Sequence, residues 1–111
     1  MRNPITYRIW LDDIRAAPDG YLLCRSVNDA KLFIESVNKN YPCTFILDLD
    51  HDLGEYAYDG GDAIELIKWL LWEGYHEMKW IEFAFNLHTM NPVGRQNMQQ
   101  LIDRYFKKEV T

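Results

Sequence analysis

The chain of 111 residues carries 12 Lys and Arg against 17 Asp and Glu, a formal net charge of −5, and 48% of its residues are hydrophobic. That length fits a single domain over residues 1–111, and the apolar content predicts a packed core and excludes a disordered chain. The acidic balance excludes binding along duplex nucleic acid, which depends on Lys and Arg neutralising phosphates. No apolar run approaches the roughly 20 residues that span a bilayer, and Met1–Tyr7 lacks the apolar stretch of a signal peptide. We therefore expect a cytoplasmic protein without membrane contact.

The first half of the chain predicts two strands, a helix and a third strand. Tyr7–Leu11 is rich in β-branched and aromatic residues, and Tyr21–Arg25 follows a Pro-Asp-Gly turn signal. Because the connection between them is short, this second strand is expected to run antiparallel at an edge of the sheet. Ser26 is a favoured N-cap, and the helix after it has one apolar face, made by Ala30, Phe33, Ile34 and Val37. Thr44–Leu49 is the most strand-like run and is predicted to be central.

The second half predicts a helix, a strand and a final helix. The first helix begins near Asp62 and ends before Gly74, a plausible C-cap, while Trp80–Leu87 alternates apolar and polar residues as a strand does. Asn91 is a favoured N-cap and Pro92 a favoured first helical residue. Strands that alternate with helices predict an α/β fold, with a mostly parallel four-stranded sheet and about three helices. Cys24 and Cys43 lie in or beside predicted strands, without a CxxC spacing, and are interpreted as buried free thiols.

Three of the predicted strands end in polar clusters: Asp12-Asp13, Asp50-His51-Asp52 and His88-Thr89-Met90-Asn91. In parallel α/β sheets, ligands bind outside the carboxyl ends of the strands, so these clusters are the candidate site. Carboxylates gathered there would repel one another unless a cation compensates, and Mg²⁺ prefers carboxylate oxygens. The alternative is that these acids are solvated and cap turns or helices. Zinc could use His51, His88, Asp50 and Asp52, but no zinc-motif spacing favours it.

His51 and His88 follow two strands that are expected to be neighbours. Two imidazoles in one cleft could act as base and acid in the opening of a cyclic phosphate, because their ordinary pKa lies near neutral pH. The alternative is that each hydrogen-bonds loop backbone. His76 lies in a polar segment away from any cluster and is interpreted as a surface residue.

The start of the last predicted helix, Asn91-Pro92-Val93-Gly94, presents free backbone N–H groups that favour an anion. Gly94 would allow a phosphate to approach closely, Arg95 could form a bidentate contact, and Asn97 offers an amide donor. Every helix has such a start, so ordinary capping is the alternative.

Three motifs together resemble the cyclic-phosphate processing receiver domain family, a receiver-like group of bacteria and phages. They are Leu11-Asp12-Asp13-x-Arg15, Leu49-Asp50-His51-Asp52-Leu53-Gly54 and His88-x-x-Asn91-Pro92-x-Gly94-x-x-Asn97-Met98. The resemblance implies a receiver-like (flavodoxin-like) three-layer sandwich, here truncated. It also implies that Asp12 and Asp13 bind Mg²⁺, that Asp50 completes that site, and that Thr89 corresponds to the hydroxyl residue after the fourth strand.

The chain also departs from true receivers. Ile14–Gly20 stands where a receiver has its first helix, and no lysine at the end of a fifth strand is evident. Phosphorelay by Asp50 is therefore not expected, and His51 and His88 favour hydrolysis instead. Asp48 places a carboxylate inside the third strand, where a neutral residue is expected.

We therefore expect a phosphoesterase-like hydrolase, dependent on Mg²⁺ or Mn²⁺, that acts on a cyclic phosphate of a nucleotide or an RNA end. The alternative is a non-catalytic receiver-like module that binds a phosphorylated ligand, a cyclic nucleotide or a protein partner; exposed aromatic side chains could also support a homodimer. The catalytic candidates are His51, His88 and Asp50. The metal candidates are Asp12, Asp13, Asp50 and Asp52. The substrate-binding candidates are Arg15, Thr89, Asn91, Gly94, Arg95 and Asn97.

Overall fold

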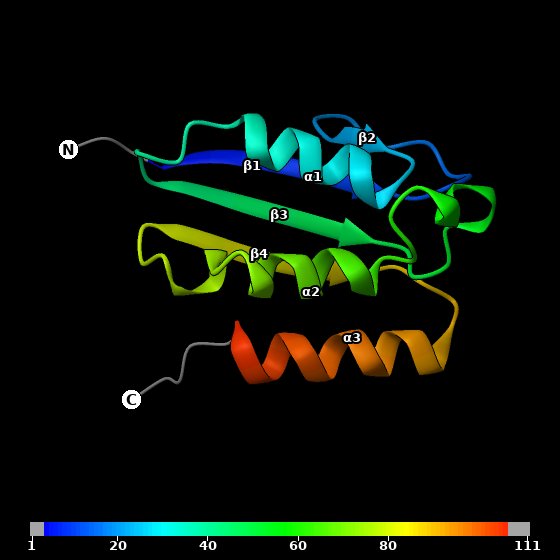
Figure 1. The fold of residues 1–111 in the computed structure, drawn as a ribbon. Helices are drawn as coiled ribbons and strands as arrows, with labels where there is room; N and C mark the ends of the chain where they lie inside the picture. Colours follow the sequence, from blue (N-terminus) through cyan, green and yellow to red (C-terminus); the bar gives the residue numbers. More distant parts are fainter. Residues whose placement is uncertain (1–3, 107–111) are drawn as a thin grey trace.

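The computed structural model describes residues 4–106, and its elements alternate as predicted (Figure 1). A four-stranded sheet has the order β2-β1-β3-β4, with all neighbours parallel. The strands are β1 (Ile5–Leu11), β2 (Leu22–Cys24), β3 (Cys43–Leu49) and β4 (Ile81–Leu87). The helices are α1 (Val27–Ser36), α2 (Ile64–Trp72) and α3 (Pro92–Tyr105), with short 3₁₀ helices η1 (Gly54–Tyr58) and η2 (Tyr75–Glu77). The predicted α/β class, the parallel sheet and the three helices are confirmed.

The helices begin where their capping residues predict. The Ser26 side chain accepts a hydrogen bond from the Asp29 backbone N–H, and that of Asn91 accepts one from Gly94 at 3.0 Å. Pro92 is the first residue of α3, where its missing N–H costs nothing. Among the described residues, no helix combines the length and apolar character needed to cross a membrane.

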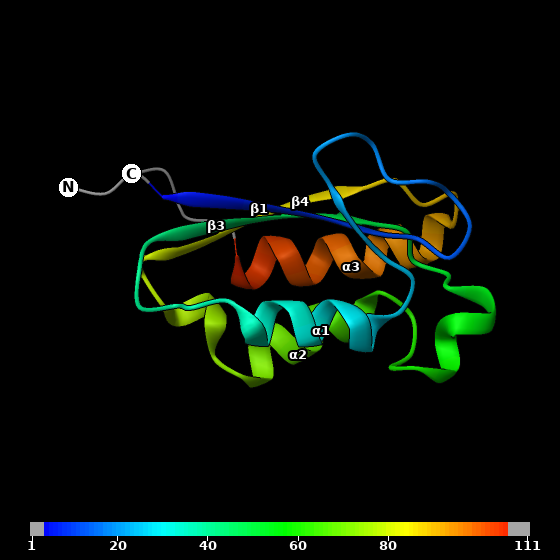
Figure 2. The ribbon, with the colours of Figure 1, turned by 90° about the horizontal axis from the view of Figure 1, so that it is seen from above.

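The second strand runs parallel to β1, so the antiparallel expectation is wrong. Ile9 pairs with Leu22, and Leu11 pairs with Cys24. Residues 12–21 contain no helix, yet they return along the face of the sheet opposite the helices before β2 begins (Figure 2). This return of the chain restores the direction of β1 and makes a parallel pair possible.

One face of the sheet carries the core, and all three helices pack on it (Figure 2). Odd-numbered residues of β1, β3 and β4 point to that face, and those that are 0% exposed are Ile9, Leu11, Phe45, Leu47 and Leu49. Across the strands, the Phe45 ring stacks on Tyr7 with centroids 5.3 Å apart and on Phe83 at 5.5 Å. Burial of these side chains supplies the main stabilisation of the fold.

The opposite face of the sheet is not covered by a helix within residues 4–106, so the described region has two layers and not the expected three (Figure 2). Arg8 and Ala84 are exposed there, and Ile46 is half-buried. The physical reason is that the connection from β1 to β2 forms no helix, while α1, α2 and α3 all pack on the other face.

The two cysteines are buried and free, as predicted. Burial, with a smaller contribution from the negative charge of Asp29, raises the pKa of the Cys24 thiol to about 11. This thiol therefore stays protonated and unreactive at neutral pH.

Phe45→Ala is expected to lower the free energy of unfolding by about 3–5 kcal/mol, because it leaves a cavity at the centre of the core. Urea unfolding followed by circular dichroism measures the loss. Trp72→Ala is the matched control, because Trp72 is 88% exposed and its removal should leave stability nearly unchanged. Equal losses in the two variants would contradict this description of the core.

Candidate functional site

Three chemically active side chains meet at the carboxyl edge of the sheet. Asp12 follows β1, Asp50 follows β3 and His88 follows β4. One ligand atom from each lies within 4.8 Å of the others. Because these three strands are adjacent and parallel, their ends converge, and the residues that follow them share one site.

Asp12 is almost completely buried, and each of its oxygens has a partner. Oδ1 accepts hydrogen bonds of 2.8 Å from the backbone N–H groups of Ile14 and Arg15. Oδ2 lies 2.9 Å from Nε2 of His88. Burial alone would raise the pKa of Asp12, but these two backbone donors and His88 outweigh it and hold the pKa below its ordinary value. Asp12 is therefore a fixed negative charge at neutral pH.

The pKa of Asp50 is shifted in the opposite direction, above its ordinary value. Burial and the nearby charges of Asp12 and Asp13 raise its pKa, and a hydrogen bond with Thr89 only partly opposes the shift. The negative charge at this edge is thus incompletely compensated by the protein itself. A cation bound among these carboxylates would relieve that repulsion.

The imidazole of His88 is held on three sides. Nδ1 lies 2.5 Å from Oδ1 of Asp48, Nε2 faces Asp12, and the ring stacks on the Trp10 indole with centroids 4.0 Å apart and planes 6° apart. Asp48, the carboxylate that is unexpected within a strand, is therefore a partner of His88. The sequence marks His88 as a site candidate and Asp48 as an unusual strand residue. It does not predict that β3 and β4 place these two side chains in contact.

His51 belongs to a second cluster, with Asp52 and Asp62. Its Nδ1 lies 2.7 Å from Oδ1 of Asp52, and this hydrogen bond is the main reason that the pKa of Asp52 is lowered. The His51 ring also packs on the first turn of α3, where a Cβ added to Gly94 would lie 2.5 Å from Cγ of His51. The space left by the missing side chain of Gly94 is thus occupied by an imidazole, where the sequence analysis expected a phosphate.

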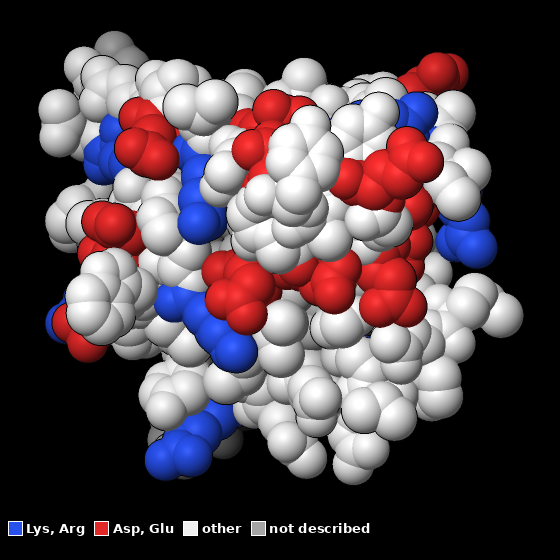
Figure 3. Space-filling view, turned by 45° about the vertical axis from the view of Figure 1, so that its right-hand side comes forward, with Lys and Arg blue, Asp and Glu red and all other residues white. Residues whose placement is uncertain are grey.

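A pocket of about 440 Å³ opens beside both clusters. Its lining comprises Asp13, Ile14, Arg15, Asp50, Asp52, Gly54, Thr89, Met90 and Asn91, which include six of the predicted site residues. Asn91 connects the pocket to the second cluster, because its Nδ2 donates to Asp52 at 3.1 and 3.2 Å. Figure 3 turns this end of the molecule forward and shows Asp and Glu side chains grouped over it.

The remaining predicted substrate-binding residues lie apart from this pocket. The Arg95 guanidinium donates to the backbone carbonyl of Thr89 at 2.9 Å and lines a neighbouring pocket. Asn97 is exposed on α3 and lines neither pocket. Arg25, which the sequence analysis did not single out, supports the site by donating to the carbonyls of Asp12 and Arg15 at 3.1 and 2.9 Å. No sequence motif marked Arg25, because its partners are backbone atoms.

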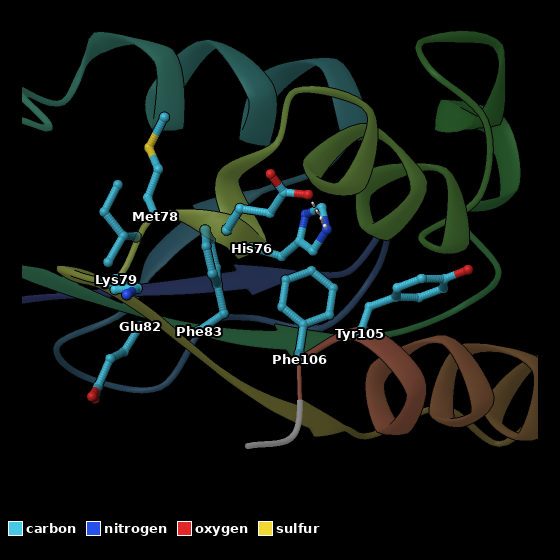
Figure 4. Close-up of a pocket in the computed structure, with 9 residues that line it drawn as sticks. His76, Met78, Lys79, Glu82, Phe83, Tyr105 and Phe106 are labelled. Atoms are coloured by element: carbon cyan, nitrogen blue, oxygen red, sulfur yellow. Dashed lines mark ion pairs between the residues drawn. The ribbon is translucent and has the colours of Figure 1, made fainter. Parts of the chain in front are cut away.

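His76 is not the surface residue that was predicted. Only 18% of its side chain is exposed, and the ring contacts the rings of Tyr105 and Phe106, as Figure 4 shows. It lines a pocket of about 340 Å³ near the beginning of β4, at the end of that strand opposite the carboxylate site. The packing of η2 against α3 buries it, which a polar local sequence does not reveal.

Replacement of the buried Asp12 and of the half-buried Asp50 is expected to change stability in opposite directions. Because the folded-state pKa of Asp12 is lowered, its ionised form stabilises the fold above its ordinary pKa, and this contribution is lost as pH falls through the lowered value. Ionised Asp50 destabilises the fold at neutral pH, and that cost disappears as pH falls through its raised pKa. Without added cations at pH 7, Asp12→Asn should therefore lower Tm by several degrees and Asp50→Asn should raise it slightly.

Differential scanning calorimetry measures both values, with the exposed Asp19→Asn as the control for loss of one charge. The difference in Tm between Asp50→Asn and the wild type should become smaller as the pH is lowered. A drop in Tm for Asp50→Asn as large as that for Asp12→Asn would contradict the electrostatic balance described above.

Gly94→Ala is expected to destabilise the protein by about 1–3 kcal/mol, because the added methyl group overlaps the His51 ring. In a His51→Ala background the same change should instead stabilise by roughly 0.5–1 kcal/mol, since Ala is the better helix former. Urea unfolding of the four proteins in this cycle measures the coupling. An identical cost in both backgrounds would show that His51 does not occupy the space above Gly94.

Comparison with known proteins supports the resemblance seen in the three motifs. Residues 7–104 match the family model described as the cyclic-phosphate processing receiver domain. The searches of curated proteins and of solved structures found no match. The family match covers β1 from Tyr7 onward, the other three strands, the helices up to residue 104, and both carboxylate clusters. The chain therefore belongs to the cyclic-phosphate processing receiver domain family.

Proposed function

We propose that this receiver domain is a divalent-cation-dependent phosphoesterase that opens a cyclic phosphate on a nucleotide or an RNA end. The observation that carries the proposal is the meeting of Asp12, Asp50 and His88 beside a pocket lined by the hydrogen-bond donors Arg15, Thr89 and Asn91. Carboxylates, an imidazole and hydrogen-bond donors around one cavity suit metal-assisted hydrolysis.

The side chains at this edge fit a divalent cation. Asp12 and Asp50 offer carboxylate oxygens and His88 offers Nε2, while Asp13 and Asp52 line the adjoining pocket. The raised pKa of Asp50 indicates negative charge that a cation would neutralise. Oxygen ligands suit Mg²⁺, and an added imidazole also suits Mn²⁺. When bound, such an ion would polarise a phosphoryl oxygen and acidify a water molecule.

Arg15, Thr89 and Asn91 are proposed to hold the phosphate. All three line the pocket, and Arg15 is already oriented by a 3.3 Å hydrogen bond from its guanidinium to the carbonyl of His88. The surrounding carboxylates would repel an anion, so we expect phosphate to bind well only after the cation. Arg95 is proposed to fix the position of Thr89, because its guanidinium donates a hydrogen bond to the backbone carbonyl of that residue.

Hydrolytic opening of a cyclic phosphate requires two proton transfers. Water attacks phosphorus and loses a proton, one phosphorus–oxygen ester bond breaks, and the leaving oxygen receives a proton. We propose that His88 handles the proton of the attacking water, because Nε2 faces the cluster of Asp12 and Asp50. His51 is proposed as the second proton carrier. The role of His51 is tested by a variant of its own, because the His51 ring belongs to the cluster with Asp52 and Asp62.

A second candidate function is binding of a phosphorylated ligand or a cyclic nucleotide without turnover. The observation that favours it is that both ring nitrogens of His88 already contact carboxylate oxygens in this structure. Isothermal titration calorimetry that shows tight binding, followed by recovery of the unchanged ligand, would support this function over hydrolysis.

The decisive assay measures hydrolysis of 2′,3′- and 3′,5′-cyclic nucleotides with Mg²⁺ or Mn²⁺. We expect turnover by the wild type, and Asp50→Asn and His88→Ala should each lose about 10²–10⁴-fold in kcat. Asp19→Asn is the control that removes an exposed carboxylate. No turnover by the wild type, or equal turnover by His88→Ala, would refute the proposal. Wild-type rates in His51→Gln would remove that residue alone from the mechanism.

A further inference from the structure

We propose that Asp48 is a positioning residue: it fixes the tautomer and the orientation of His88, so that Nε2 is presented to Asp12 and Asp50. The inference rests on the site of the proposed function, but it concerns a residue to which that function assigns no role. It follows from the cross-strand position of Asp48, the contacts of its two oxygens and the stacking of His88 on Trp10.

Asp48 belongs to a row of side chains on the sheet face that no helix of residues 4–106 covers. It pairs in register with Trp10 on β1 and with Asn86 on β4. His88 follows Asn86 two residues later, just beyond the end of β4. Because side chains alternate along a strand, residues two apart project to the same face. One face of three strands thus brings together all the groups that hold the imidazole.

Both carboxylate oxygens of Asp48 are engaged. Oδ2 accepts a 2.9 Å hydrogen bond from Nδ2 of Asn86, and Oδ1 lies 2.5 Å from Nδ1 of His88. Asp48 is only 4% exposed, and a buried carboxylate is costly unless it is paired and hydrogen-bonded. The Asn86 contact fixes the rotation of the carboxylate, so Oδ1 is aimed at His88 in one direction.

A carboxylate at Nδ1 determines which ring nitrogen keeps its proton. Since an ionised carboxylate only accepts hydrogen bonds, Nδ1 donates to Asp48 and Nε2 donates to Asp12 in the cation-free site. When a cation takes the place of the Nε2 proton, the hydrogen bond to Asp48 keeps the remaining hydrogen on Nδ1. Stacking of the ring on the Trp10 indole fixes the plane of the imidazole. With its plane and one nitrogen fixed, the ring can direct Nε2 only toward Asp12, at 2.9 Å.

This arrangement matches the carboxylate–histidine pairs that orient metal-binding imidazoles. With Nδ1–H donated to Asp48, a cation that replaces the Nε2 proton meets the lone pair of Nε2 directed at Asp12 and Asp50. Loss of such a partner typically weakens metal affinity by about 10–100-fold. Asp48→Asn is therefore expected to weaken cation binding although Asp48 is not itself a ligand.

The experiment combines nuclear magnetic resonance of the ¹⁵N-histidine-labelled chain with calorimetric titration of Zn²⁺, a diamagnetic probe. In the cation-free wild type we expect a low-field Nδ1–H proton from His88, since its hydrogen bond to Asp48 is short. Asp48→Asn should abolish that resonance and weaken Zn²⁺ binding about 10–100-fold. Asp19→Asn, the matched control, should change neither readout. Both readouts are independent of turnover.

Asn86→Ala tests the same inference if Asp48→Asn does not fold. It leaves the carboxylate in place but frees its rotation, so we expect a broadened Nδ1–H resonance and a smaller loss of Zn²⁺ affinity. Wild-type spectra and affinity in whichever of these two variants folds would overturn the positioning role. A wild type that shows the resonance without hydrolysing any cyclic nucleotide would refute the proposed phosphoesterase and leave the role of Asp48 intact.

Discussion

The structure of this edge of the sheet depends on one imidazole, that of His88, held between the carboxylates of Asp12 and Asp48. These side chains come from the ends of β1, β3 and β4, so the contact joins three strands where their backbone pairing stops. Two nearly buried carboxylates would be unfavourable there without a hydrogen-bonding partner. His88 serves both of them, and its position on the Trp10 indole keeps it between them.

The sheet face that no helix covers within residues 4–106 also carries part of this interaction. Asp48, Asn86 and the ring of His88 form a polar network on that face. A helix packed over such a network would have to satisfy or displace it, because buried polar groups require partners. The described region instead places its apolar packing on the other face, and leaves the polar row beside the site.

The sequence was sufficient to predict the elements, the centrality of β3 and the gathering of the three polar strand ends, because these follow from periodicity, caps and parallel topology. It could not predict the parallel direction of β2, which depends on the path taken by residues 12–21. The pairing of His88 with Asp48 was equally hidden, since it depends on register between strands about forty positions apart in sequence. The sequence indicated that the missing side chain of Gly94 leaves room for a close neighbour. Only the structure shows that this neighbour is the ring of His51.

We propose that Asp12, Asp50 and His88 form a cation site beside the pocket that Arg15, Thr89 and Asn91 line. Anomalous X-ray diffraction from crystals soaked in Mn²⁺ tests it most directly, because it locates the ion without requiring a substrate. We expect an anomalous peak at coordination distance from a carboxylate oxygen of Asp50, from Asp12 and from Nε2 of His88. A peak confined to the cluster of His51, Asp52 and Asp62, or no peak at either cluster, would contradict it.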